Sequence, residues 1–221
     1  MNQLKTAKKI SKEQFFYIIS IVYVVFMICA NVMASKIISV GGFIIDAGTL
    51  TYPFTFMLGD VLADLYGYKP AKKIILWGFA ANFIFSICCM LGTFVPGLYA
   101  DDALTNSYNI LFSYNIRILI AGFLGYIFGT MLNAASLVWI KKITGEKWLA
   151  LRTIGSTVLG AAVDTALFTV IAWVGSIPVK DMIIMGLSGY VVKIIFEAII
   201  ATPLDYALLP IIRKKVEGFS K

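Results

Sequence analysis

Seven ionisable residues of this 221-residue chain lie inside long apolar stretches, where charged side chains are rare. A charge near the centre of a bilayer costs about 2.5–3.5 kcal/mol on insertion scales, and a lipid-facing position does not repay that cost. We therefore expect these side chains to point inward, to pair with one another or to line a water-filled cavity. The seven residues are Asp60, Asp64, Arg117, Asp164, Lys193, Glu197 and Asp205.

The spacing of four of these residues predicts how they interact. Asp60 and Asp64 are four residues apart and share one face of a helix. Two carboxylates on one face repel each other unless a cation, a proton or a hydrogen-bond donor of a ligand lies between them. Lys193 and Glu197 have the same spacing with opposite charges, which predicts an ion pair that points into the protein.

Polar side chains at other depths add to this predicted interior. Asn31, Asn82 and Asn133 also lie in apolar stretches, and amides there form hydrogen bonds between helices. Arg117 and Asp205 lie closer to the ends of their stretches, so their charged groups could reach the membrane interface.

Several classes of chemistry are excluded by what the sequence lacks. The chain has no histidine, which removes Ser–His and Cys–His nucleophilic pairs and histidine metal sites. An intramembrane aspartyl protease needs two acids from different helices, and Asp60 with Asp64 does not supply them. No G-x-x-x-x-G-K-[ST] motif occurs, so no ATPase loop is present. We therefore expect a protein without enzymatic activity, cofactor or metal site.

The composition predicts an all-α integral membrane protein. Hydrophobic residues make up 60% of the chain and charged residues only 14%, against roughly 45–50% and 25% in soluble domains. A membrane helix needs about 20 largely apolar residues, and six stretches qualify. We expect one transmembrane domain over residues 1–221, with spans near 14–34, 50–66, 74–95, 110–140, 153–174 and 182–212. A short interfacial segment is expected over Ser39–Gly48.

The basic residues predict how these spans are oriented. Of the 19 Lys and Arg residues, 15 lie at the N-terminus, in 67–73, in 141–152 and in 213–221, which six spans place on one side. Only Lys36 and Lys180 lie in the opposite loops. By the positive-inside rule, both termini are expected in the cytoplasm of a cell whose plasma or inner membrane holds the chain. The net charge of +7 therefore reflects topology, and we expect no nucleic-acid partner.

Glycines on the fourth predicted span indicate close helix packing. Gly122, Gly125 and Gly129 lie near one another, and Gly125–Gly129 has the spacing of a small-xxx-small motif. The partner helix could belong to the same chain or to a second copy in a homodimer.

Taken together, these motifs resemble one known family. The chain is similar to the queuosine precursor transporter family, also called the vitamin uptake transporter family, over nearly its whole length. The segments that carry the resemblance are Tyr52–Lys73, Arg117, Gly155–Thr157 with Asp164-Thr165, and Lys193-x-x-x-Glu197 with Pro203. At position 64 this chain has Asp where relatives often have Glu or another residue, which makes a shared role for Asp64 less certain than one for Asp60.

The resemblance implies a six-span bundle that imports 7-deazaguanine precursors of the tRNA nucleoside queuosine. The 7-cyano base, the 7-aminomethyl base and queuine all remain candidates, as do facilitated and ion-coupled transport. A 7-deazaguanine presents its N1–H and 2-amino group side by side, and one carboxylate can accept both. Asp164 and Glu197 are favoured for that contact, because Asp60 and Asp64 also suit a cation or proton. Lys193, Arg117 or an asparagine could donate to the carbonyl oxygen of the base.

Other function classes remain open. A substrate-binding subunit of an energy-coupling-factor vitamin transporter is also a small six-span chain without an ATPase. A membrane enzyme or a structural scaffold is the third class, and the missing histidine and nucleophile motif weigh against an enzyme.

Overall fold

The computed structural model is almost entirely helical, and it describes residues 10–98, 102–144 and 149–216. The longer helices are α1 (Lys12–Met33), α2 (Tyr52–Tyr66), α3 (Tyr68–Thr93), α4 (Ala103–Thr144), α5 (Leu149–Trp173), α6 (Val179–Phe196) and α7 (Thr202–Lys215). A 3-10 turn, η1 (Ala47–Leu50), precedes α2, and a π-helical turn, η2 (Glu197–Ala201), joins α6 to α7. Two short strands, β1 (Ile37–Val40) and β2 (Phe43–Asp46), form one antiparallel hairpin.

Five helical segments in the described ranges are long and apolar enough to cross a bilayer. They are Lys12–Met33, Tyr68–Thr93, Ala103–Asn133, Gly155–Trp173 and Val179–Ile200. These segments overlap the first, third, fourth, fifth and sixth spans expected from hydropathy, although the sixth was expected to extend to 212 and α6 ends at Phe196. The chain is therefore a helical protein with several apolar helices, as the composition predicted.

The second predicted span forms a shorter helix. α2 has 15 residues, so its length is about 22 Å against a hydrocarbon thickness of about 30 Å. Gly67 ends α2 with a backbone φ of +88°, a conformation that glycine adopts without strain, and α3 starts at the next residue. α2 and α3 are therefore two separate helices joined by a sharp turn.

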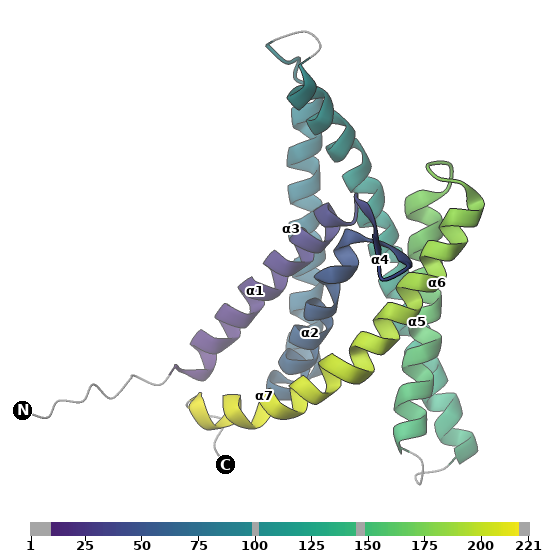
Figure 1. The fold of residues 1–221 in the computed structure, drawn as a ribbon. Helices are drawn as coiled ribbons and strands as arrows, with labels where there is room; N and C mark the ends of the chain where they lie inside the picture. The colour runs from purple at the N-terminus through teal and green to yellow at the C-terminus, as the bar shows by residue number, and fades with distance from the viewer. Residues whose placement is uncertain (1–9, 99–101, 145–148, 217–221) are drawn as a thin grey trace, which may run out of the picture.

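The segment expected to be interfacial, Ser39–Gly48, contains most of a β-hairpin. Val40 pairs with Phe43 across a two-residue turn made of Gly41 and Gly42, which both have positive φ. A Gly-Gly pair between runs of β-branched residues suits such a turn, because its backbone twist matches that of the strands. The hairpin packs against α6, and its last strand leads into the turn before α2 (Figure 1).

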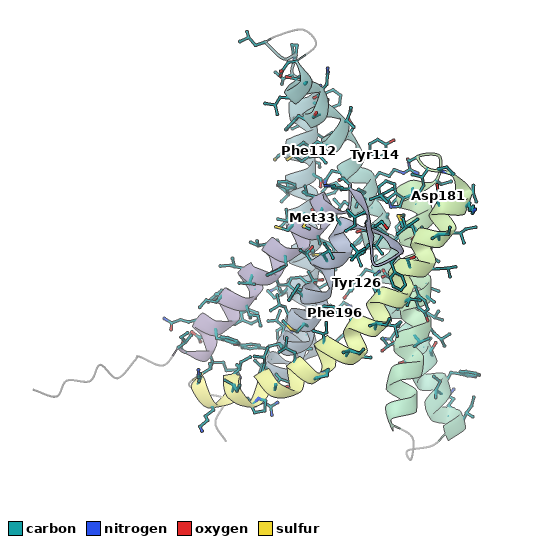
Figure 2. All side chains as sticks on the ribbon, in the orientation of Figure 1. Met33, Phe112, Tyr114, Tyr126, Asp181 and Phe196 are labelled. Atoms are coloured by element: carbon teal, nitrogen blue, oxygen red, sulfur yellow. The ribbon has the colours of Figure 1, made fainter. Side chains whose placement is uncertain are left out.

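The start of α1 and the end of α7 lie on the same side of the molecule. Figure 1 shows them toward the bottom of the view, together with the α2–α3 junction and the end of α4. Apolar side chains of α1, α2 and α7, including Ile19, Leu62 and Leu209, pack together there. Figure 2 shows Asp181, at the start of α6, toward the other side, where the chain turns from α5 into α6.

Helices α4 and α5 pack so closely that a methyl group would not fit between them. A Cβ atom added to Gly129 would lie 2.8 Å from the Asp164 Cβ, and one added to Gly160 would lie 2.7 Å from the Asn133 Cβ. Real Cβ contacts are almost never that short, so glycine is required at both positions. The close packing predicted for Gly125 and Gly129 is confirmed, and its partner is α5 of the same chain. A homodimer stays a prediction.

Candidate functional site

Six elements enclose a cavity of about 70 Å³ in the middle of the protein. α1, the β2–η1 segment, α3, α4, α5 and α6 each contribute to its wall. Phe79, Phe168 and Met185 form part of an apolar lining. The polar and charged groups among the described lining residues include Asn31, Asp46, Thr49, Asn82, Asp164 and Lys193.

Asp164 and Lys193 form an ion pair between α5 and α6 at the cavity wall. The Lys193 Nζ lies 2.8 Å from the Asp164 Oδ2 and donates a second hydrogen bond to the Thr165 Oγ1 at 3.2 Å. The two side chains are only 12% and 16% exposed, so water screens their attraction weakly. Gly125 makes room for this arrangement, because a Cβ there would lie 2.8 Å from both the main-chain oxygen and the Oδ1 of Asp164.

Asp46 brings a second carboxylate to the cavity from the end of the hairpin. Its Oδ1 accepts a hydrogen bond from the Thr49 N–H at 3.0 Å, and its Oδ2 accepts one from the Thr49 hydroxyl at 3.1 Å. The residue is partly accessible because it lines the cavity, yet protein surrounds it. This burial raises the pKa of the Asp46 carboxyl above its usual value, against the opposing effects of the Lys193 charge and the Thr49 hydrogen bonds.

Gly48 lets the 3-10 turn η1, which follows the hairpin, lie directly against α1. A Cβ on Gly48 would collide with the Ala30 carbonyl oxygen and would lie 2.9 Å from the Asp46 Oδ1. The first of these atoms belongs to the backbone of a helix and cannot move aside cheaply. The missing side chain at position 48 therefore fixes the depth at which Asp46 enters the protein.

Asparagines on α1, α3 and α4 provide neutral polar groups. The Asn31 Nδ2 and the Ser86 hydroxyl both donate to the Asn115 Oδ1, at 3.1 and 2.7 Å. Asn82 is 2% exposed, and its Nδ2 lies 3.5 Å from the Met27 carbonyl oxygen. Its Oδ1 has no hydrogen-bond partner among the residues that the structure describes. A buried acceptor without a donor is costly, and a bound molecule with an N–H group would satisfy it.

Four of the residues expected to bind a substrate come together here. Asn31, Asn82, Asp164 and Lys193 all line the cavity, although they come from four different helices.

Two further candidates lie elsewhere. Arg117 donates to the carbonyl oxygens of Ile171 and Val174 and to the Ser176 hydroxyl, at and just beyond the end of α5. There it satisfies carbonyl groups that a helix end leaves free, and its charge suits the negative end of the helix dipole. Asp64 forms a half-exposed ion pair with Arg213 of α7.

The remaining acids fall outside the described part of the structure. The side chains of Asp60, Glu197 and Asp205 are not described, although their backbones belong to α2, η2 and α7. The pairing of Lys193 with Glu197 therefore stays a prediction, whereas Asp164 is an observed partner of Lys193.

The sequence reasoning missed Asp46 as a site residue. It lies in a segment with several glycines between two apolar runs, which favoured a position at the membrane surface. The available signal was the Gly41-Gly42 pair between β-branched residues, which predicts a hairpin. Asn115 was missed as well, because one amide in a long apolar stretch gives no indication of its partners.

Known proteins similar to this chain identify its family. Residues 46–208 match the family described as "Putative vitamin uptake transporter". A Bacillus subtilis (strain 168) protein named "Probable queuosine precursor transporter" is 26% identical over 181 residues, covering 81% of this chain and 78% of that protein. A Haemophilus influenzae protein with the same name is 24% identical over 176 residues, covering 77% and 71%. No solved structure matches the chain. The resemblance that the motifs of this chain indicated is therefore confirmed. Because the matched region spans most of the chain, this protein belongs to the vitamin uptake transporter family.

Proposed function

We propose that this protein imports queuosine precursors of the 7-deazaguanine class and binds them in the central cavity. The relatives with that name and the family match support the substrate class. The observation that carries the proposal is the cavity itself. Two carboxylates, an ammonium group and an amide oxygen without a partner among the described residues lie there among apolar walls. A transport role, rather than catalysis, suits a site of this kind.

The chemistry of the cavity suits a flat, polar base. A 7-deazaguanine has a carbonyl acceptor beside two neighbouring N–H donors on one edge and a pyrrole N–H on another. It therefore needs acceptors toward both edges and one donor beside the first. Asp46, Asp164 and Asn82 offer acceptors, and Lys193 offers a donor. Phe79 and Phe168 line the same space and could pack against the faces of the ring.

The proposed transporter has six spans, with both termini in the cytoplasm and residues 1–221 as one domain in the cell membrane. α2 is the short second span in this proposal. The concentration of basic residues in the segments that six spans place on one side supports this orientation. Reporter fusions after Lys73, Lys142 and Lys215 should be active in the cytoplasm, and fusions near Asp102 and Ser176 should be external. An external signal at Lys142 would contradict the six-span arrangement.

A growth experiment tests the substrate class. The chain is expressed in cells that can neither make queuosine precursors nor import them, and each candidate base is supplied at low concentration. Queuosine should then appear in the tRNA for at least one of the 7-cyano base, the 7-aminomethyl base and queuine. The cells must carry the later enzymes that convert each base into queuosine, so that a missing signal reports on import and not on those enzymes. If none of the bases restores queuosine while the protein is present in the membrane, the proposal is wrong.

A further inference from the structure

We infer that Asp46, on the β-hairpin, is the carboxylate that accepts the N1–H and 2-amino groups of the base and so selects guanine-type rings. This inference rests on the proposed function and assigns the specificity of its binding site. Asp46 was not among the acids that the sequence pointed to. The reasons for preferring it to Asp164 lie in how the two carboxylates are already occupied.

Asp164 is committed to Lys193. A lysine ammonium 2.8 Å from one of its oxygens, in a pair that is mostly buried, neutralises the charge that would attract a donor edge. Taking Asp164 away from Lys193 to bind a neutral base would leave an ammonium group stranded at low dielectric. The ion pair instead leaves Lys193 with further N–H donors, which suit the carbonyl oxygen of the base.

Asp46 has acceptor capacity left. An ionised carboxylate has about four lone-pair sites, and the backbone N–H and hydroxyl of Thr49 occupy two of them. Among the described residues, no cation lies within hydrogen-bonding distance of Asp46. Acceptor sites therefore remain on the carboxylate beyond those that Thr49 uses, although the backbone N–H of Asp46 itself also acts on it. A carboxylate with two adjacent acceptors matches the two adjacent donors of a guanine edge.

Thr49 holds the carboxylate in position before the base arrives. Its two hydrogen bonds, one to each oxygen, prevent rotation of the carboxylate plane. The close contact of Gly48 with α1 fixes the backbone that carries both residues. Binding therefore requires little reorganisation of this group, which makes the recognition selective.

A second acceptor supports a ligand rich in N–H groups. The Asn82 Oδ1, which has no hydrogen-bond partner in the described part of the chain, belongs to a residue of α3 that lines the same cavity. A guanine-type base still has its pyrrole N–H after the N1–H and 2-amino groups have bound a carboxylate. That group is a suitable donor for Asn82.

Equilibrium binding to the purified protein tests the assignment. The ligands are 7-cyano-7-deazaguanine and the analogue that lacks only the 2-amino group. The parent protein should prefer the amino compound by about tenfold or more, because one charge-assisted hydrogen bond distinguishes the two. Asp46→Asn should weaken binding of the amino compound by about 10²-fold or more and remove most of the preference.

Two matched variants serve as comparisons. Asp64→Asn makes the same chemical change at a half-exposed ion pair outside the cavity, and it should keep the affinity and preference of the parent. Thr49→Val keeps the Asp46 charge but removes the hydroxyl that orients it, and it should reduce the preference several-fold. Thr49→Ser should restore the preference. These variants also test the inference if Asp46→Asn fails to fold.

The outcomes separate this inference from the proposed function. If Asp46→Asn keeps both the affinity and the preference of the parent, Asp46 is not the recognition group. If only Asp164→Asn loses the preference, the role belongs to Asp164. An Asp46→Asn protein that binds normally but loses the pH dependence of uptake would make Asp46 a proton site and overturn the inference. If the parent binds neither base, the proposed function fails and the inference fails with it.

Discussion

Replacing Gly125 by alanine tests how closely α4 and α5 pack beside the ion pair. In the structure, the new Cβ atom would lie 2.8 Å from the Asp164 carbonyl oxygen and 2.8 Å from its Oδ1. One of these atoms belongs to the backbone of α5, so the two helices must separate or the Asp164 side chain must turn. Gly122, one turn earlier on the same helix, has no atom within 4 Å of an added Cβ and is the matched control for stability.

The expected magnitude follows from two opposing terms. Alanine is favoured over glycine inside a helix by about 1 kcal/mol, and overpacking costs about 1–3 kcal/mol. Gly122→Ala should therefore gain up to about 1 kcal/mol, whereas Gly125→Ala should lose between about zero and 2 kcal/mol. The two variants should differ by about 1–3 kcal/mol, with Gly125→Ala the less stable.

Thermal unfolding of both purified variants in the same detergent measures this difference, and ligand binding reports on the site. Gly125→Ala should also weaken binding of a 7-deazaguanine, because it displaces the carboxylate that holds Lys193. Equal stability of the two variants would refute the reasoning, since it would mean that α4 and α5 do not approach closely at position 125.

Three further predictions concern charged groups. Lys193→Met leaves the Asp164 carboxylate buried without its partner, so it should cost several kcal/mol of stability. Adding Asp164→Asn should recover much of that loss. If thermal unfolding instead shows that the two losses add, the observed ion pair is contradicted. Arg117 binds the end of α5, so Arg117→Lys should lower stability and leave the dissociation constant of the base unchanged. Weaker binding at unchanged stability would instead support the predicted role of Arg117 in recognition. Burial raises the pKa of Asp46, and the donor edge of the base needs the ionised carboxylate. The affinity for the base should therefore fall as the pH drops through that pKa. Lys193 and Asp164 are the other charged residues among the described cavity lining. Asp46→Asn should lack this dependence in binding titrations, and an equal dependence would assign it to another group.

The spans were predictable because lipid imposes a strong constraint on sequence. Five of the expected apolar stretches overlap helical segments that are long and apolar enough to cross a bilayer, since about 20 apolar residues are needed for that. The sixth stretch was expected to run to 212, but the π-helical turn η2 divides it after α6. The same constraint predicted that Asn82, Asp164 and Lys193 would face the interior, because polar groups on the lipid side are costly. The second expected span, 50–66, also nearly matches α2 (Tyr52–Tyr66), which ends at the sharp turn at Gly67.

The partners of the charged residues depend on tertiary structure. Lys193 and Asp164 are 29 positions apart in the sequence, and their contact depends on the axial offset between the packed helices α5 and α6. The spacing of residues within one helix carries no information on that offset, so it indicated only Glu197 as a partner for Lys193. Arg117 likewise contacts residues more than 50 positions away, at a helix end that only the fold brings near. Asp46 enters the cavity because a hairpin folds back between helices, which hydropathy alone does not reveal.

The most direct test of the transport proposal is counterflow in liposomes that contain only this chain. Vesicles are loaded with unlabelled 7-cyano-7-deazaguanine, 7-aminomethyl-7-deazaguanine or queuine, and uptake of a trace of the same base in labelled form is followed. Counterflow requires no energy source, so it detects both facilitated and ion-coupled carriers and needs no ATPase partner. We predict transient accumulation of at least one base, no accumulation of adenine, and a strong reduction in Asp46→Asn. A protein that binds these bases tightly yet shows no counterflow would contradict the account and would point to a substrate-binding subunit that needs partner proteins.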